Sequence, residues 1–453
     1  MEKMIFDLAH EKKFVKLRSM LSEMNPADIA EILNEAPSKE QLPIIFRLLP
    51  KELAAETFVE LDSDMQQTLI EAFSDNELKE FLDELFLDDT VDIIDEMPAT
   101  VANRILKHTD SQTRKQINQL LAYPDDSAGS IMTTEYISLR KDITVSEAFD
   151  KIRLVGIDAK DLYTCYVVDK ERKLEGYVTV KDLLLSDKET VISNIMEENV
   201  IYATTLEDKE EVADKFQKYD LLVMPVVDKE NRLVGIVTVD DAIDVLQEEA
   251  TEDIEKMAAI LPSDKSYFKT DVFSIFKARI PWLMLLMLSA TVTGAIISSF
   301  EEKLQIFPAL IAFIPMLMGT AGNSGSQSSV TVIRSISLGD IEFKDIFKVL
   351  WKELRVAIAC SIALAIVNFA KMWLVDYWIL GAFDGGKQLV EITVVCLTLL
   401  FTVVVAKIVG AVLPIIAKKI GFDPAVMASP LITTTVDAIS LIIYFRVAVM
   451  WLY

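Results

Sequence analysis

The sequence has few residues of the types that build disulfide frameworks, zinc sites or common catalytic centres. Its 453 residues include only 3 cysteines and 2 histidines. Cys165, Cys360 and Cys396 have no paired spacing, so they predict neither a disulfide framework nor a zinc site. His10 and His108 are far apart and read as ordinary surface residues. With no phosphate-binding loop and no nucleophile with a base, an enzyme is the least favoured class.

Positive charge is scarce in the first part of the chain. Residues 1–275 carry 31 Lys and Arg against 59 Asp and Glu, a net charge of −28. Residues 276–453 carry 14 against 11, a net of +3, and the two sum to the total of −25. Such an acidic surface excludes nucleic acid as a partner and suits divalent cations. The N-terminus has no apolar signal core, so no export signal is expected.

Residues 1–124 have the apolar spacing of short amphipathic helices. Asn25–Pro37 is echoed by Leu87–Pro98, each with a polar start, an acidic helix and a terminating Pro. The echo predicts stacked helical hairpins. In the second copy three carboxylates share one face, which is either a solvated surface or a set of cation ligands: Asp88, Asp92 and Asp95.

Between residues 126 and 250 the pattern changes to strands alternating with helices. The segment Tyr166–Asp182 matches Pro225–Asp241 at an offset of 59 residues, and both contain Gly-x-Val-Thr-Val-x-Asp. This repeat resembles a tandem pair of CBS domains, which are regulatory modules that dimerise and often bind adenine nucleotides. The resemblance puts Thr238 and Asp241, like Thr179 and Asp182, where a nucleotide would lie. Alternatively, the Asp residues cap helices. The predicted strands are Thr164–Val168, Tyr177–Val180, Val223–Val227 and Ile236–Val239.

An acidic amphipathic segment, Asp240–Met257, follows the second repeat without a helix breaker. It reads either as an inert connector or as a regulatory element leading to the membrane. Five apolar segments follow, each long enough to span a bilayer: Ile280–Phe300, Ile306–Ile333, Val349–Tyr377, Ile392–Ile416 and Val426–Trp451.

The basic residues of the loops alternate between the two sides of the predicted spans. Lys277 and Arg279 precede the first span, a larger group lies between the second and third, and Lys418 and Lys419 lie between the last two. The positive-inside rule therefore predicts a multi-pass protein of the cell membrane, with residues 1–275 in the cytoplasm and Tyr453 outside.

Asp437 lies in the middle of the last apolar segment. A carboxylate near the bilayer centre costs about 2.5–3.5 kcal/mol on insertion scales. The nearest basic residue on the same segment is Arg446, nine positions away. A protonated or helix-paired carboxylate is one interpretation, and we favour a cation site inside the membrane.

The second predicted span contains the polar, glycine-rich stretch Gly319–Gln327. We expect this stretch to interrupt the helix and to line a cavity, where irregular backbone is tolerated at membrane depth. Close packing of helices at Gly319, Gly322 and Gly325 is the competing interpretation. For Asn323 and Gln327 we favour a polar cavity.

Together these features resemble the MgtE family of magnesium channels over essentially the whole chain. The match is carried by Gly319–Gln327, Arg334, Gly421–Pro430, Thr433–Asp437 and Glu249–Ile254. The implied organisation is a multidomain membrane protein. Its parts are an all-α superhelical domain (1–125), two α/β CBS domains (126–190 and 191–248), an acidic linker helix (249–278) and a five-span pore domain (279–453).

The resemblance implies a homodimeric, lipid-embedded pore that passes Mg²⁺ and is closed by cytoplasmic Mg²⁺. The expected pore residues are Asp437, Asn323, Gly319 and, at the outer end, Glu301. It leaves open whether ATP binds the CBS pair. The expected regulatory ligands are Glu210, Asp220, Asp241, Asp244, Glu249, Glu252 and Asp253, with Asp88, Asp92 and Asp95 added from the N-terminal array.

Two rival functions remain open. A transporter for another divalent ion would keep the architecture; the lack of His, Cys or Met pairs in the polar segments argues against a soft metal but not against Mn²⁺. A non-transporting receptor, in which the CBS pair senses a nucleotide and the spans only anchor it, would not require Asp437.

Overall fold

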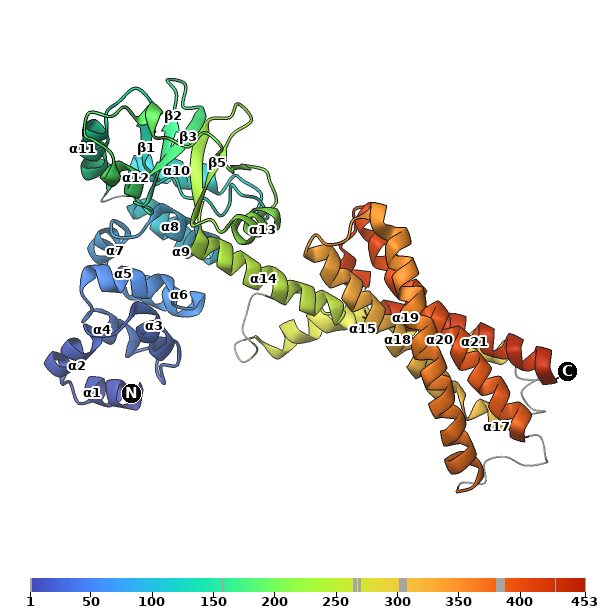
Figure 1. Cartoon of the computed structure of the whole chain (residues 1–453). Helices are drawn as coiled ribbons and strands as arrows, with labels where there is room; N and C mark the ends of the chain where they lie inside the picture. Colours follow the sequence, from blue (N-terminus) through green and yellow to red (C-terminus); the bar gives the residue numbers. More distant parts are fainter. Residues whose placement is uncertain are drawn as a thin grey trace. The chain divides into compact units, whose positions relative to one another are not determined.

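The structure is a computed structural model that describes residues 2–156, 159–263, 267, 270–300, 308–379, 388–427 and 429–452. The chain divides into two compact units, Met1–Leu246 and Gln247–Tyr453 (Figure 1).

The first unit begins with an array of short helices, as the sequence predicted. Prolines and caps set their lengths: Pro26 begins α3, Pro98 precedes α9, and Ser74 and Glu77 form a capping box on α7. Their apolar faces form one core, in which Leu17 and Ile29 are fully buried. The helices are α1 (Glu2–His10), α2 (Phe14–Leu21), α3 (Pro26–Asn34), α4 (Leu42–Phe46), α5 (Lys51–Val59), α6 (Ser63–Ala72), α7 (Asp75–Leu82), α8 (Leu87–Glu96), α9 (Ala99–His108) and α10 (Ser111–Leu120).

Two three-stranded sheets follow, one for each predicted repeat. In each sheet the first strand is parallel and the third antiparallel to the central one, in the orders β1-β2-β3 and β4-β5-β6. The predicted strands are confirmed within three residues at each end. The elements are β1 (Ser138–Arg140), α11 (Val145–Val155), β2 (Thr164–Val168), β3 (Leu174–Thr179), α12 (Val180–Leu185), η2 (Ile192–Asn194), β4 (Ala203–Thr204), α13 (Lys209–Tyr219), β5 (Val223–Val227) and β6 (Leu233–Thr238).

The two repeats pair with each other through equivalent hairpin turns. The amide of Leu174 donates to the carbonyl oxygen of Asn231 at 3.0 Å, and the amide of Leu233 donates to that of Arg172 at 2.9 Å. Arg172 and Asn231, 59 positions apart, both have left-handed backbones with φ of 66° and 62°. The sequence repeat is therefore a structural repeat, and its two halves form one module.

Helix α14 (Val239–Met257) connects the two units. Its first part packs in the first unit, where Ala242 and Val245 are buried, and its residues from Gln247 onward belong to the second. The segment Asp240–Met257, predicted as one long helix or a pair of helices, is one uninterrupted helix.

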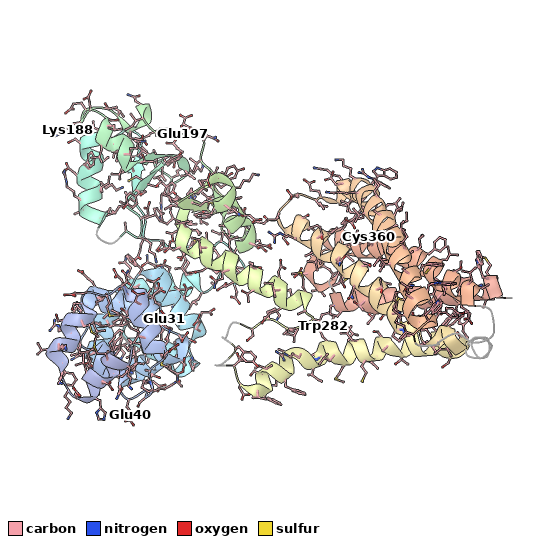
Figure 2. The ribbon with its side chains drawn as sticks, turned by 60° about the horizontal axis from the view of Figure 1, so that its bottom comes forward. Glu31, Glu40, Lys188, Glu197, Trp282 and Cys360 are labelled. Atoms are coloured by element: carbon pink, nitrogen blue, oxygen red, sulfur yellow. The ribbon has the colours of Figure 1, made fainter. Side chains whose placement is uncertain are left out.

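The second unit consists of long apolar helices. Among the described residues, four stretches are long and apolar enough to cross a membrane: Val272–Ser299, Phe343–Tyr377, Leu389–Lys419 and Pro424–Trp451. Trp282 lies near the start of α15 and Cys360 within α19 (Figure 2). The elements are α15 (Val272–Ser299), α17 (Pro308–Ile311), α18 (Ile314–Ser337), η3 (Phe343–Asp345), α19 (Ile346–Lys371), η4 (Met372–Tyr377), α20 (Gln388–Lys419), η5 (Pro424–Met427) and α21 (Ser429–Leu452).

The prediction that Gly319–Gln327 interrupts the second span is wrong, because α18 runs through this stretch as one helix. A helix satisfies its own backbone hydrogen bonds, so no cavity is needed to hold it at membrane depth. Two of the glycines instead permit close packing. A Cβ atom on Gly322 would lie 2.9 Å from Thr433, and one on Gly410 of α20 would overlap the carbonyl oxygen of Gly325.

Candidate functional site

Asp437 lies on α21 and is only partly exposed. Its Oδ1 atom is buried and accepts no hydrogen bond. No ion pair to Asp437 occurs within the described ranges either. A carboxylate oxygen withdrawn from water without a donor is unfavourable until a cation or a proton reaches it. The geometry therefore fits the predicted cation site.

Three contacts show that η5 and α21 run antiparallel to α17 and α18. Ser329 donates to the carbonyl oxygen of Met427 at 3.3 Å, the hydroxyls of Ser326 and Thr433 lie 3.5 Å apart, and Tyr444 donates to the carbonyl oxygen of Leu310 at 2.8 Å. Asp437 follows Thr433 by one helical turn. It therefore lies near the depth of Gly319, with which the sequence analysis had grouped it.

The polar side of α18 is uncovered within the single chain. Gly319, Asn323 and Gln327 recur every four residues, so they share one stripe, and all three are exposed. A Cβ atom on Gly319 would meet nothing within 4 Å. The described part of the chain does not enclose this stripe. Glu301, the predicted outer residue, lies outside the described residues.

A second group of carboxylates lies in the first unit, between the helical array and the CBS module. Asp88 and Asp89 begin α8, and the Lys160 ammonium lies 3.0 Å from Asp88 Oδ2 and 3.2 Å from Asp89 Oδ1. Asp241, at the start of α14, is close enough for its charge to act on Asp92 and Lys160. Three predicted ligands, Asp88, Asp92 and Asp241, thus lie close enough for their charges to act on one another, although in the described residues they do not converge as a metal site.

Burial and mutual repulsion act on the carboxylates of this group. Burial, followed by the charge of Asp88, raises the pKa of Asp89 to about 6. Burial also raises the pKa of Asp241 to about 7, against a hydrogen bond of 2.5 Å donated by Thr238. Glu135 has its pKa raised to about 7, again mainly by burial, although it accepts a hydrogen bond from the Leu87 amide. Carboxylates crowded in this way favour a divalent counter-ion.

Thr238 and Asp241 also bear on the nucleotide prediction. Their hydrogen bond lies at the start of α14, as expected for a helix cap. Because the nearby Asp88 and Asp240 also act on Asp241, negative charge gathers at this position. The geometry supports the capping interpretation and disfavours a polyphosphate here.

The remaining predicted ligands do not form a set within one chain. Across the described segments, no three Asp, Glu, His or Cys side chains converge as a metal site. Asp95, Glu210 and Asp220 are exposed at the surface of the first unit, and Asp220 ends α13 with a left-handed φ of 51°. Asp244 is exposed and Glu249 partly buried, both on α14.

The end of α14 contacts the helices that carry the membrane site. Lys256 Nζ lies 2.5 Å from Glu252 and 2.7 Å from Asp423, and Ser337 donates to Asp253 at 3.4 Å. Burial, followed by the charge of Asp423, raises the pKa of Asp253. Met257 packs with the end of α18 and with η5, directly before α21. The linker therefore touches the cytoplasmic side predicted for the spans.

Sequence reasoning missed four residues of these sites: Asp89, Lys160, Lys256 and Asp423. Asp89 adjoins the predicted Asp88, and Asp423 lies in the quoted stretch Gly421–Pro430, so both had a local signal. The two lysines had none for these sites, because Asp88 and Asp89 lie far from Lys160 in the sequence and Asp423 lies far from Lys256.

An unpaired carboxylate on apolar helices, joined by a continuous helix to an acidic unit with a CBS pair, defines a multi-pass membrane transport protein with a control domain. Comparisons identify the class further. The family described as "Divalent cation transporter", MgtE, matches residues 314–447. The MgtE intracellular N domain matches 24–126, and CBS domains match 128–189 and 192–248.

The chain belongs to the MgtE family. It is 37% identical to the "Magnesium transporter MgtE" of Thermus thermophilus over 95% of this chain and 94% of the relative. The Bacillus subtilis protein of the same name is 34% identical over 99% and 97%. Both are transporters, which confirms the expectation that the chain is not an enzyme.

Two solved structures resemble the first part of the chain. The cytosolic domain of the Mg²⁺ channel MgtE in complex with ATP has a TM-score of 0.51 and 36% identity, covering 54% of this chain and all of that structure. The soluble part of a magnesium transporter has a TM-score of 0.51 and 27% identity, covering 55% and 98%.

Proposed function

We propose that the protein carries Mg²⁺ into the cell across the cytoplasmic membrane, with Asp437 as the cation site of the pore. The observation that carries the proposal is the buried Oδ1 atom of Asp437, which accepts no hydrogen bond within the described residues. Mg²⁺ prefers carboxylate oxygens and keeps several waters, so one carboxylate per chain suits a hydrated ion. The magnesium transporters related to this chain over nearly its full length support the choice of ion.

The pore forms between two copies of the chain. The exposed polar stripe of Gly319, Asn323 and Gln327 would be unfavourable against lipid, and a second copy would cover it while leaving a water-filled path. Two Asp437 carboxylates would then face one ion, with Glu301 near the outer entrance. Exposed apolar side chains on the CBS module, including Leu184, Leu185 and Ile243, supply a second surface for the dimer.

The polar helix α18 serves as the fifth span beside the four apolar ones. Its Gly-rich face packs on α20 and α21 although its composition is not that of a lipid-facing helix. Counted in this way, the basic loops put the first unit in the cytoplasm and the C-terminus outside.

Cytoplasmic Mg²⁺ closes the pore by bridging the acidic faces of the control unit. Without it, the carboxylates repel each other and the domains separate, moving α14 and the contact of Lys256 with Asp423. Only ions that bind the closed state preferentially shift the gate. The bridging ligands we propose are Asp88, Asp92, Asp95, Glu210, Asp220, Asp241, Asp244, Glu249, Glu252 and Asp253.

We also propose that the CBS pair binds an adenine nucleotide, since the related cytosolic domain was solved with ATP. Our initial candidates were Thr238 and Asp241, but the carboxylates around Asp241 favour the equivalent Thr179 and Asp182 of the first repeat. Nucleotide binding to Asp182→Asn and Asp241→Asn variants separates the two positions.

The test of transport is Mg²⁺ flux into liposomes that contain the purified protein, with Mg²⁺ varied on the cytoplasmic side. Flux is expected to fall as cytoplasmic Mg²⁺ rises. The triple variant Asp241/Asp244/Glu249→Ala is expected to remain open at concentrations that close the wild type. No Mg²⁺ flux at any internal concentration would refute the transport function and favour a nucleotide receptor.

A further inference from the structure

We propose that Lys160 is a tethered counter-ion that Mg²⁺ must displace from Asp88 and Asp89, so that this lysine sets the Mg²⁺ concentration at which the helical array locks onto the CBS module. The inference rests on the proposed regulatory role of this acidic group. It assigns a function to a basic residue, whereas the ligands proposed above are all acidic.

Lys160 and its partners are withdrawn from solvent. The side chains of Lys160, Asp88 and Asp89 are 14%, 7% and 14% exposed. Both carboxylate oxygens of Asp88 are buried, and the Lys160 ammonium, 3.0 Å from Oδ2, is the charge that compensates them. The ammonium also lies 5.0 Å from the centre of the Phe86 ring, and the Lys160 amide donates to the Glu135 carbonyl oxygen.

The contact joins two domains. Asp88 and Asp89 lie on α8 of the helical array, while Lys160 lies in the first CBS repeat, just before β2. Breaking this ion pair would remove a charge interaction that holds the array against the CBS module.

One ammonium does not neutralise the site. The charges of Asp88, Asp89, Glu96, Asp240 and Asp241 act on the carboxylates of this group, and the Lys160 ammonium opposes them at Asp89, Glu135 and Asp241. The remaining negative charge attracts a divalent cation. That cation would compete for the oxygens held by the ammonium, and at a few ångströms the two positive charges would repel each other strongly. Mg²⁺ binding is therefore an exchange, in which the lysine is released.

This exchange predicts a dependence on Mg²⁺ that a purely structural lysine lacks. Without Mg²⁺, Lys160→Gln leaves buried carboxylates uncompensated and lowers the melting temperature of the cytoplasmic unit. At saturating Mg²⁺ the ion supplies the missing charge, so the loss disappears. Since the competing ammonium is gone, the variant is expected to respond to Mg²⁺ at a concentration lower by about tenfold.

The experiment measures thermal unfolding of the purified full-length protein across a Mg²⁺ titration at constant ionic strength. The variants are Lys160→Gln and, as the matched control, Lys141→Gln, which removes an exposed lysine 2.6 Å from Glu175 in the same repeat. Surface pairs contribute little, so the control is expected to follow the wild-type curve. Asp89→Asn, which removes a carboxylate instead, is expected to shift the response to higher Mg²⁺.

Each outcome decides the inference. An equal loss of melting temperature for Lys160→Gln at every Mg²⁺ concentration, or failure of that variant to fold even in saturating Mg²⁺, would overturn the counter-ion role while leaving the regulatory site intact. If the wild type itself shows no response to Mg²⁺, the proposed regulatory site fails, and the inference fails with it.

Discussion

The two units both keep carboxylates away from water, but they compensate them differently. Asp88 of the first unit faces the Lys160 ammonium at 3.0 Å. Asp437 of the second unit forms no ion pair among the described residues, and its Oδ1 atom accepts no hydrogen bond. A carboxylate with its own counter-ion binds a metal ion only by exchange, whereas one without it is ready to receive a passing cation.

The second unit also contains a buried cation. Lys407 on α20 is 5% exposed, and its ammonium lies 3.4 Å from the hydroxyl of Ser328, which donates to Glu353 at 2.6 Å. Lys407 is thus linked through Ser328 of α18 to Glu353 of α19. Positive charge is available inside the helical bundle, yet no basic group in the described part of the chain pairs with Asp437.

The largest expected effect comes from neutralising one carboxylate in each unit. Asp437→Asn is expected to abolish Mg²⁺ flux into liposomes, because the pore loses its charged ligand. Asp88→Asn is expected to do the opposite and maintain flux at inhibitory cytoplasmic Mg²⁺. Thr434→Ala on α21 serves as the control with wild-type flux. If both Asp variants changed flux in the same direction, the division of roles between the units would be wrong.

The next effect tests whether helix packing, rather than charge, positions the α18 stripe. Gly410→Ala introduces a Cβ atom that overlaps the Gly325 carbonyl, so we expect a loss of about 1–3 kcal/mol in unfolding free energy. Gly294→Ala, where nothing lies within 4 Å, is the matched control. Thermal unfolding in detergent measures both. Equal melting temperatures would show that the helices yield without cost.

A smaller effect is expected where the linker helix meets the membrane unit. Lys256→Gln and Asp423→Asn each remove one partner of a partly exposed ion pair, worth about 1 kcal/mol at most. Either variant should raise the Mg²⁺ concentration for half-closure by roughly fivefold or less, and the double variant should add little more. Lys344→Gln, which breaks an exposed pair with Glu342, is the control. Fully additive single effects would mean that this pair does not couple to the gate.

The smallest expected effect distinguishes two carboxylates of α8, Asp92 and Asp95. The charges of Asp88, Asp241, Asp89 and Glu96 act on Asp92, whereas Asp95, which is exposed on α8 as Asp92 is, does not belong to this set. Asp95→Asn should therefore change the Mg²⁺-dependent free energy of unfolding by no more than about 0.5 kcal/mol, less than Asp92→Asn. A calorimetric titration of both variants would measure this. A larger effect for Asp95 would point to a ligand from a second chain.

The sequence predicted the elements whose signal is local or repeated. The strands Thr164–Val168 and Val223–Val227 were found at their observed bounds because β-branched runs and the 59-residue repeat mark them. The glycine-rich stretch of α18 misled the prediction, since glycines that weaken an isolated helix in water can serve close packing in a bundle. The residue types at Gly322 and Gly325 alone could not distinguish an interrupted helix from a closely packed one.

By itself, the sequence determined the acidic control unit, the CBS repeat, the apolar spans and the isolated position of Asp437. Charge balance, the spacing of apolar residues and hydropathy are all properties of the linear sequence. Only the tertiary structure decided which lysines neutralise which carboxylates. Lys160 and Asp89 are 71 positions apart, and Lys256 and Asp423 are 167 positions apart. Such contacts leave no periodic trace, since they depend on how completed helices and sheets pack.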